Sequence, residues 1–106
     1  MVIGDKRIKI VSGDTYQKRV IIDDVDNEII KSIYFTSKEL NICRKLVFRD
    51  GAYILTLNSE ETKYDEIFRG YYDLTIEFID GKISTIVYQK PILIEPKENE
   101  VCCYGK

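Results

Sequence analysis

The stretch RGYYDLTIEFIDGKISTIVYQKPILIEP, residues 69–96, decides the fold of this 106-residue chain. Polar and apolar side chains alternate along its first half, and the side chains of a strand point in turn to opposite faces of a sheet. The apolar residues that share one face are Tyr72, Leu74, Ile76 and Phe78. The stretch therefore predicts a strand with one buried and one wetted face, then a turn and a second strand. No catalytic motif occurs in it.

The Asp80-Gly81 pair predicts the register of this hairpin. If these two residues form the turn, glycine supplies a positive φ at no steric cost and aspartate tolerates one. The facing pairs are then Phe78 with Ile83, Ile76 with Thr85, Leu74 with Val87 and Tyr72 with Gln89. A slip by one residue would expose the whole apolar face, so we expect this register to be firm. Because Pro91 cannot donate to a ladder, we also expect the second strand to bulge, change partners or run along an edge there.

The rest of the chain also favours strands. Isoleucine is far commoner than leucine and Ala52 is the only alanine. β-branched residues pack well on pleated sheets, whereas alanine favours helices. Five further strands are predicted between turn signals, over residues 6–12, 15–22, 31–38, 42–49 and 52–58. The side chains expected to share a face within a strand are Ile8 with Ile10, Ile33 with Phe35, Leu46 with Phe48, and Tyr53 with Leu55 and Leu57.

One segment departs from the strand pattern. In NSEETKYDEIF, residues 58–68, Asn58 is followed three residues later by Glu61, as in a helix capping box. Acidic residues fill the first turn, where the helix dipole favours them. We therefore expect one or two helical turns near residues 59–67.

Gly70 stands two residues before Tyr72, ahead of the long strand. A tyrosine placed in this way is typical of the tyrosine corner of immunoglobulin-like sandwiches. The same placement also fits a plain first core residue of the strand. Turn signals at these intervals are typical of a sandwich or a small barrel, so the residues by themselves predict an all-β domain.

The residues give little support to an enzyme or a metal site. There is no histidine, which removes the commonest general base and the commonest zinc ligand. Cys43 has no such base to activate it, so we expect a buried or half-buried strand cysteine. Asp23, Asp24 and Asp26 could attract calcium, but they lack the EF-hand spacing and fit a solvated turn better. We predict no catalytic residue, no metal and no cofactor.

Composition bears on partners and location. The chain has 16 basic and 18 acidic residues, so no strong field of one sign favours nucleic acid or an anionic membrane. The sequence contains no run of about 18 apolar residues, so we expect no membrane span. The first residues also lack the apolar core of a signal peptide. The three cysteines, Cys43, Cys102 and Cys103, lack the spacing of a disulfide framework and indicate a reducing cytosol.

The outer face of the hairpin offers a candidate interaction surface. Tyr71 and Tyr88 are expected to project from it, beside Asp73 and Glu77. Exposed tyrosines suit protein interfaces and sugar stacking. Amphipathic residues on any sheet surface would give the same pattern, and that interpretation stays open.

Seven short motifs follow one another along most of the chain. They are GDT (13–15), DDVDNEI (23–29), IYFTSK (33–38), DG (50–51), EET (60–62), GYYDLTIEF (70–78) and TIVYQKPILIEP (85–96). In this order they resemble the small immunoglobulin-like proteins of phages and prophages, of the kind found at the N-terminus of upper baseplate proteins of Gram-positive phages. The chain departs from that family between Thr62 and Gly70, which lacks an expected leucine, and at Gln89-Lys90, where a glycine is usual.

The resemblance implies an all-β, immunoglobulin-like β-sandwich of about seven strands, with one short helical turn near residues 59–67. We expect residues 1–98 to form this single domain and residues 99–106 to be a polar tail. The resemblance also implies a non-enzymatic tail or baseplate component, made in the bacterial cytoplasm and carried in the virion if assembled.

The expected partners are other phage tail or baseplate proteins, or further copies of this chain. No catalytic residue is carried over, because the family pattern offers none. The alternative function is a carbohydrate-binding or adhesion module that uses exposed tyrosines, although the chain has no tryptophan for such a site.

Overall fold

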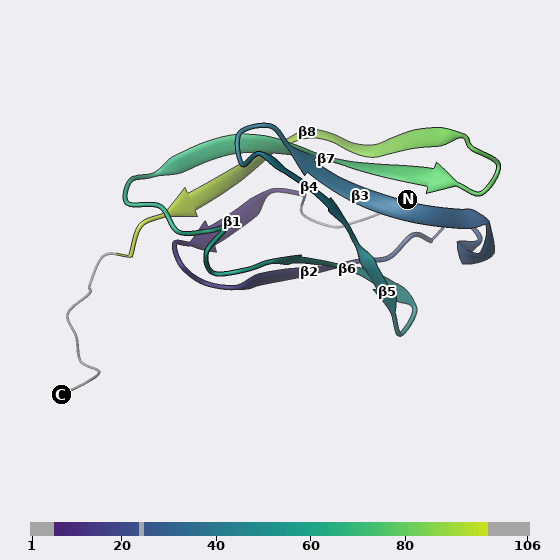
Figure 1. The fold of residues 1–106 in the computed structure, drawn as a ribbon, viewed down its shortest axis with the longest axis horizontal. Coiled ribbons are helices and arrows are strands. Elements are labelled where there is room, and N and C mark those ends of the chain that lie inside the picture. The colour runs from purple at the N-terminus through teal and green to yellow at the C-terminus, as the bar shows by residue number, and fades with distance from the viewer. Residues whose placement is uncertain (1–5, 24, 98–106) are drawn as a thin grey trace.

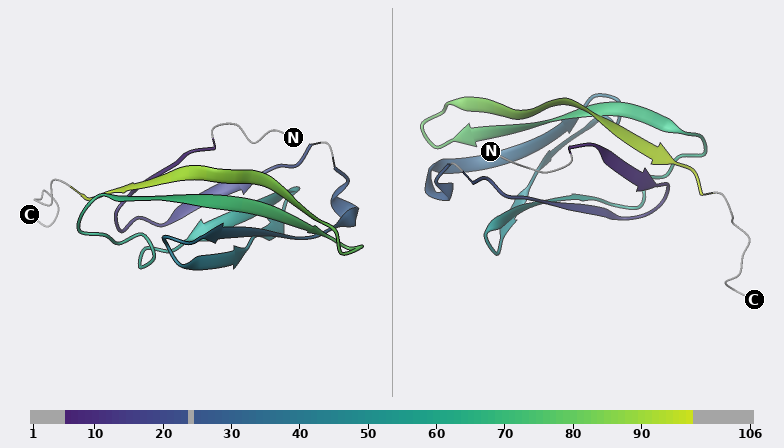
Figure 2. Two further views of the ribbon diagram at one scale, coloured as in Figure 1. Left: turned by 90° about the horizontal axis from the view of Figure 1, so that it is seen from above. Right: turned by 180° about the vertical axis from the view of Figure 1, so that it is seen from behind.

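Two β-sheets packed face to face form the molecule (Figure 1). The computed structural model describes residues 6–23 and 25–97. The strands are β1 (Ile8–Val11), β2 (Tyr16–Val20), β3 (Ile30–Ser37), β4 (Ile42–Lys45), β5 (Val47–Arg49), β6 (Ala52–Leu57), β7 (Phe68–Phe78) and β8 (Ile83–Glu95). A short 3₁₀ helix, η1 (Asn27–Ile29), precedes β3. Most of the strands run along the long axis of the molecule, as two further views show (Figure 2).

β7 lies at the centre of the larger sheet. The five-stranded sheet has the order β1-β8-β7-β3-β4, and the three-stranded sheet has the order β2-β6-β5. β1 pairs with β8 in parallel, and the other described pairs are antiparallel. In immunoglobulin terms, β3, β7 and β8 correspond to strands C, F and G, and β2, β6 and β5 to strands B, E and D. The predicted all-β, immunoglobulin-like sandwich is confirmed, with eight strands in the described residues.

The alternation along β7 places its apolar face in the core. Tyr72, Leu74 and Ile76 are all almost completely buried. On the neighbouring strand β3, Phe35 lies opposite Leu74 and Ile33 lies opposite Ile76, and both are fully buried. Burying side chains of this size stabilises the fold by about 1.5–3 kcal/mol each. The other residues predicted to face inward that are buried are Ile8, Ile10, Leu46, Tyr53, Leu55 and Leu57.

The hairpin between β7 and β8 turns through three residues instead of the expected two. The Gly81 amide donates to the Phe78 carbonyl, and the Phe78 amide donates to the Lys82 carbonyl, both at 2.9 Å. Gly81 has a φ of +92°, as the last position of a three-residue loop with a G1 bulge requires. The side chain of Asp80 accepts from the Lys82 amide at 2.9 Å. The predicted turn is therefore wrong by one residue.

The register between β7 and β8 matches the predicted one at a single pair. Leu74 lies opposite Val87 as expected, but Ile83 lies opposite Glu77 instead of Phe78. The other displaced pairs are Ile76 with Ser84 and Tyr72 with Lys90. The register shifts on both sides of the Leu74 pair, and each shift inserts an extra residue into β8. Near the turn, the corrected register directs Ile83 outward, and this residue is 67% exposed.

The second shift lies next to Pro91, where the sequence predicts a disrupted ladder. Gln89 has a φ of +51°, and its backbone amide donates to Oδ1 of Asp73 at 2.7 Å. β1 pairs only with residues 92–95 of β8. Residues 83–91 therefore have no strand on their other side among the described residues. The expectation of a bulge or an edge at this proline is confirmed.

Residues 42–49, predicted as a single strand, cross from one sheet to the other. β4 belongs to the five-stranded sheet and β5 to the three-stranded sheet. Leu46 between them is buried, and its amide donates to the Ile33 carbonyl at 2.8 Å. Phe48 is half exposed and contacts Tyr53, with ring centroids 4.8 Å apart. The prediction that Leu46 and Phe48 share a face of one strand is wrong, because the chain switches sheets between them.

Residues 59–62 form a turn and not a helix. The contacts of the capping box are present, because the side chains of Asn58 and Glu61 each accept from the other's amide at 3.0 Å. The chain then leaves the helical path. The Thr62 carbonyl accepts from the Gly13 amide at 3.1 Å and so is used in a contact with another loop. The predicted helical turn in this segment is wrong, and η1 is the helical turn of the described residues.

Tyr72 is a core residue whose hydroxyl reaches the segment before β1. Its ring stacks on Phe35 with centroids 5.4 Å apart, and its hydroxyl donates to the backbone carbonyl of Lys6. This bond ties β7 to the N-terminal side of β1, whereas a tyrosine corner would tie it to the chain just upstream. Gly70 lies within β7, where a Cβ atom would be 2.8 Å from Cβ of Glu39. The glycine thus lets the β3–β4 loop pack closely on β7.

Replacing Ile76 by alanine tests the buried face of β7. We expect Ile76→Ala to lower the free energy of unfolding by about 2–5 kcal/mol, because the fully buried side chain would leave a cavity. Ile83→Ala on the same hairpin is the matched control. It should change stability by about 0.5 kcal/mol or less, because Ile83 is exposed. Urea unfolding followed by circular dichroism measures both, and equal losses would contradict the observed register.

Candidate functional site

The outer face of the five-stranded sheet carries the residues that the sequence singles out. Tyr71, Asp73 and Glu77 alternate with the buried residues of β7 and so point outward. Tyr88 follows the buried Val87 on β8 and points to the same side. Tyr71 is 50% exposed and Tyr88 is 70% exposed. Glu77 lies near the hairpin turn, so these residues spread along the face and do not form one cluster.

Both carboxylates of this surface make local contacts. Asp73 accepts from the backbone amide of Gln89 at 2.7 Å and from its side-chain amide at 3.2 Å. Glu77 lies 3.6 Å from Nζ of Lys31. Asp73 therefore holds the bulge of β8 in place. The two tyrosines are the predicted side chains that present the most surface to a partner.

The same face continues over β3 and β4, where the sequence does not indicate a site. Tyr34 and Thr36 alternate with the buried residues of β3, and Thr36 lies opposite Cys43 on β4. Cys43 is exposed, so the expectation of a buried or half-buried cysteine is wrong. The reason is the register, because Phe35 lies opposite Arg44 and thereby turns Arg44 inward and Cys43 outward.

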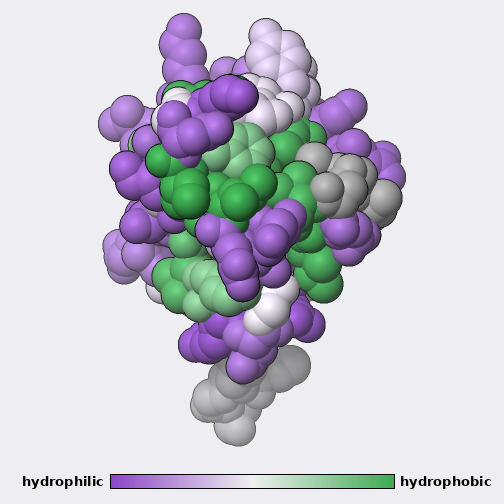
Figure 3. Space-filling model, turned by 90° about the vertical axis from the view of Figure 1, so that its right-hand side faces the viewer, coloured by the Kyte–Doolittle hydropathy of each residue, from purple (hydrophilic) through white to green (hydrophobic). Residues whose placement is uncertain are grey.

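Apolar side chains gather at the end of the molecule formed by the β7–β8 turn and η1, with hydrophilic residues around them (Figure 3). A hollow of about 460 Å³ at this end is lined by Ile29, Phe78, Ile79, Asp80 and Lys82. The Ile79 amide donates to the Ile29 carbonyl at 3.0 Å, which holds the turn against η1. The prediction did not reveal this exposed end, because it placed Phe78 on the buried face of β7, whereas Phe78 is only partly buried and lines the hollow.

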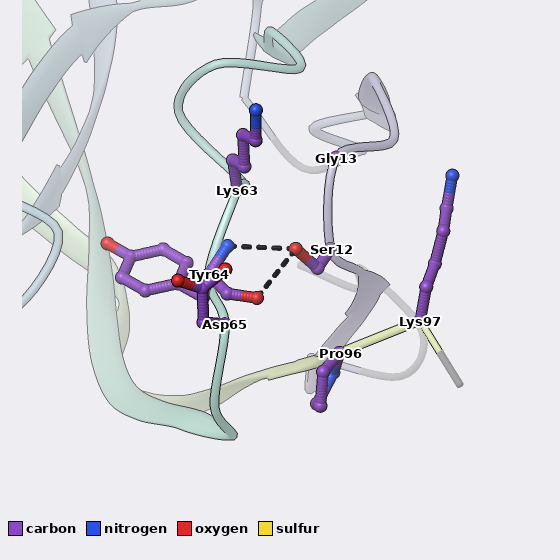
Figure 4. Close-up of a pocket in the computed structure, with 7 residues that line it drawn as sticks. All are labelled: Ser12, Gly13, Lys63, Tyr64, Asp65, Pro96 and Lys97. Carbon is purple, nitrogen blue, oxygen red and sulfur yellow. Dashed lines mark hydrogen bonds between the residues drawn. The ribbon is translucent and has the colours of Figure 1, made fainter. Parts of the chain in front are cut away.

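A pocket of about 270 Å³ lies where the β1–β2 turn meets the loop between β6 and β7 (Figure 4). Its lining residues are Ser12, Gly13, Lys63, Tyr64, Asp65, Pro96 and Lys97. The Ser12 hydroxyl accepts from the Tyr64 amide at 2.8 Å and donates to the Tyr64 carbonyl at 2.9 Å. These two hydrogen bonds connect the β1–β2 turn to the loop between β6 and β7, so the role of this serine is structural.

The shortest described ion pair joins β4 to the loop that follows β6. Arg44 on β4 donates to the Glu61 carboxylate at 2.7 and 2.5 Å, and to the Thr56 carbonyl of β6 at 2.9 Å. The hydrogen bonds from Arg44 hold the pKa of Glu61 below its usual value; burial opposes this effect and the Asn58 amide adds to it. The same hydrogen bonds raise the pKa of Arg44. The pair closes the side of the sandwich between β4 and β6.

Two other pKa shifts follow from contacts within the sandwich. The Tyr71 amide donates to Oε1 of Glu39 at 3.1 Å, and this bond lowers the pKa of Glu39. Burial raises the pKa of Tyr53. The pKa of Glu39 is thus shifted by a hydrogen bond, and the pKa of Tyr53 by burial.

The described residues contain no group of three or more His, Cys, Asp or Glu side chains that could hold a metal ion. Asp26 caps η1 by accepting from the Glu28 amide at 2.9 Å. Asp24, Cys102, Cys103 and the tail predicted at residues 99–106 lie outside the described residues. Within the described part of the chain, no helix is long and apolar enough to cross a membrane.

The Arg44–Glu61 pair predicts how stability depends on pH. The pKa of Glu61 is lowered in the folded state. The pair therefore stabilises the fold above the unfolded-state pKa, and this contribution is lost as the pH falls through the folded-state pKa. Glu61→Gln should lower the free energy of unfolding by about 1–2 kcal/mol near pH 7. The stability of this variant should then fall less steeply than that of the parent between about pH 5 and pH 2.

Urea unfolding across this pH range measures the effect. Glu60→Gln is the matched control, because Glu60 is an exposed neighbour, and its profile should follow the parent. Parallel profiles for the parent and Glu61→Gln would contradict the assigned role of the pair.

The chain shows little similarity to known proteins. No family model matches it, and no curated protein matches it. Among solved structures, it is similar to murine CRIg, with 11% sequence identity and a TM-score of 0.46 over 89% of this chain and 94% of that chain.

Proposed function

We propose that the chain is a non-enzymatic structural module that works through protein–protein contacts at the outer face of its five-stranded sheet. The exposure of Tyr71 and Tyr88 on this face supports the proposal. Tyrosine is enriched at protein interfaces, because it offers a large ring and a hydroxyl that tolerates water. Tyr71 lies opposite Pro91 of β8 on one side, and on the other side its amide donates to Oε1 of Glu39 at 3.1 Å, so the residue is held in place and loses little freedom on binding.

The face is better suited to a partner than the neighbouring edge of the sheet. Residues 83–91 of β8 contain two register shifts and Pro91. Bulges and prolines on an edge oppose pairing with a further strand. A partner is therefore expected to dock on the side chains of the face and not to extend the sheet along β8.

The resemblance of the sequence motifs to phage and prophage immunoglobulin-like proteins extends the proposal to a tail or baseplate component. In such an assembly, the partners would be neighbouring tail or baseplate proteins or further copies of this chain. The protein would be made in the bacterial cytoplasm and enter the virion on assembly.

A carbohydrate-binding or adhesion module on the same face is the second candidate function. The observation in its favour is Tyr88, whose ring is exposed enough to stack on a sugar. A protein partner is the better supported of the two, because the chain has no tryptophan, the residue that sugar-stacking sites often use.

Mass spectrometry of particles purified after prophage induction in the source organism tests the proposal. We expect the chain in these particles at a fixed copy number. A Tyr71→Ser, Tyr88→Ser double variant changes only exposed side chains, so it should fold like the parent. Its incorporation should fall by about tenfold, as when an interface loses its aromatic anchors.

Val47→Ser provides the matched control for this experiment. It removes an exposed apolar side chain from β5 in the other sheet, and its incorporation should equal that of the parent. Particles that lack the chain, from cells in which it is abundant, would contradict the proposal.

A further inference from the structure

A basic hollow lies on the outer face of the five-stranded sheet, at its β1 edge. Its volume is about 470 Å³, and its lining residues are Arg7, Ile8, Lys9, Arg69, Pro91 and Leu93. Arginine and lysine supply half of this lining, and no acidic residue belongs to it. The whole chain carries a net charge of −2. The lining of the hollow is therefore basic, although the chain as a whole carries a net negative charge.

The pairing of three strands assembles the hollow. Leu93 on β8 lies between Lys9 on β1 and Arg69 on β7. Because two inter-strand spacings separate them, the backbones of Lys9 and Arg69 are about 10 Å apart. Pro91 lies opposite Tyr71, which places one of the exposed tyrosines beside the hollow. The result is an aliphatic floor with a cation on either side and an aromatic ring nearby.

Little negative charge from the described residues opposes Lys9 and Arg69. Nζ of Lys9 lies 3.6 Å from the Glu95 carboxylate, and the two side chains are 70% and 44% exposed. Such a solvated pair is weak and exchanges readily for another partner. Arg69 forms no ion pair with a described residue. A guanidinium in this setting is suited to a carboxylate, which it can bind through two parallel hydrogen bonds.

We propose that this hollow binds a carboxylate-rich, extended segment of a partner protein, an inference that rests on the proposed function. Carboxylates of the segment pair with Lys9 and Arg69. The methylene groups of its glutamate side chains cover Pro91 and Leu93, and Tyr71 adds contact area. Charge complementarity of this kind sets the register of docking and rejects basic partners.

An acidic polysaccharide would match the charge of the hollow but not its floor. Sugar rings stack on aromatic faces, whereas the floor consists of the aliphatic side chains of Pro91 and Leu93, and the neighbouring Tyr71 does not line the hollow. The aliphatic stem of a glutamate side chain fits this floor better. The observations therefore favour a protein segment.

Fluorescence anisotropy with a short, labelled poly-glutamate peptide tests the inference. We expect saturable binding that weakens as the salt concentration rises from about 50 mM to about 500 mM, because salt screens exposed charges. Arg69→Gln should weaken binding about three- to fivefold, which corresponds to the loss of one exposed ion pair. The Lys9→Gln, Arg69→Gln double variant should weaken it by about tenfold.

Arg19→Gln is the matched control, because Arg19 is an exposed arginine on β2 of the other sheet. It removes the same charge from the chain and should leave binding unchanged. Equal binding by the parent and both single arginine variants, or no binding by the parent, would overturn the inference.

Two further outcomes distinguish a protein partner from an acidic glycan, and the hollow from the virion role. Binding of a heparin oligosaccharide but not of poly-glutamate, lost in Arg69→Gln, would assign the hollow to an acidic glycan and overturn the protein partner. Poly-glutamate binding that is weakened about three- to fivefold in Arg69→Gln, together with particles that lack the chain, would support the hollow and reject the virion role.

Discussion

Burial of the apolar face of β7 is the constraint on which the rest of the structure depends. Tyr72, Leu74 and Ile76 point inward from the central strand of the larger sheet. Because side chains alternate along a strand, the same constraint directs Tyr71 and Asp73 outward. β8 pairs with this strand only by shifting its register twice. The core and the proposed contact face thus lie on the two sides of β7. The bulges that adapt β8 to β7 also oppose the pairing of a further strand along residues 83–91.

Alternation could be predicted from the sequence, whereas turn geometry could not. The Asp-Gly pair occurs at two turns. At Asp50 and Gly51 both residues have positive φ, 53° and 78°, and they form the two-residue turn between β5 and β6. At Asp80 and Gly81 the same pair belongs to a three-residue loop. Local preference cannot separate the two cases, because a glycine at positive φ satisfies both. The predicted inward face of β7 is therefore confirmed at Tyr72, Leu74 and Ile76, whereas the facing residues of β8 differ by one except at Val87.

The candidate site was also only partly predictable. The outward direction of Tyr71 and Tyr88 follows from alternation within a single hairpin. Lys9 and Arg69 lie far apart in the sequence and meet only because β1 pairs in parallel with β8. No local pattern indicates such a pairing, since it depends on how the two sheets close around the core. Cys43 was misplaced for a related reason, because the pairing of Phe35 with Arg44 between β3 and β4 decides which side of β4 faces inward.

Backbone amide chemical shifts, recorded while the isotope-labelled protein is titrated with poly-glutamate, test most directly whether the outer face of the five-stranded sheet is the contact surface. Saturable shifts should concentrate at Lys9, Arg69, Tyr71 and Leu93 and at their neighbours on that face. The amides of β2, β5 and β6 should stay in place. Shifts of similar size on those three strands, or no shifts at saturating peptide, would contradict the assignment of this face.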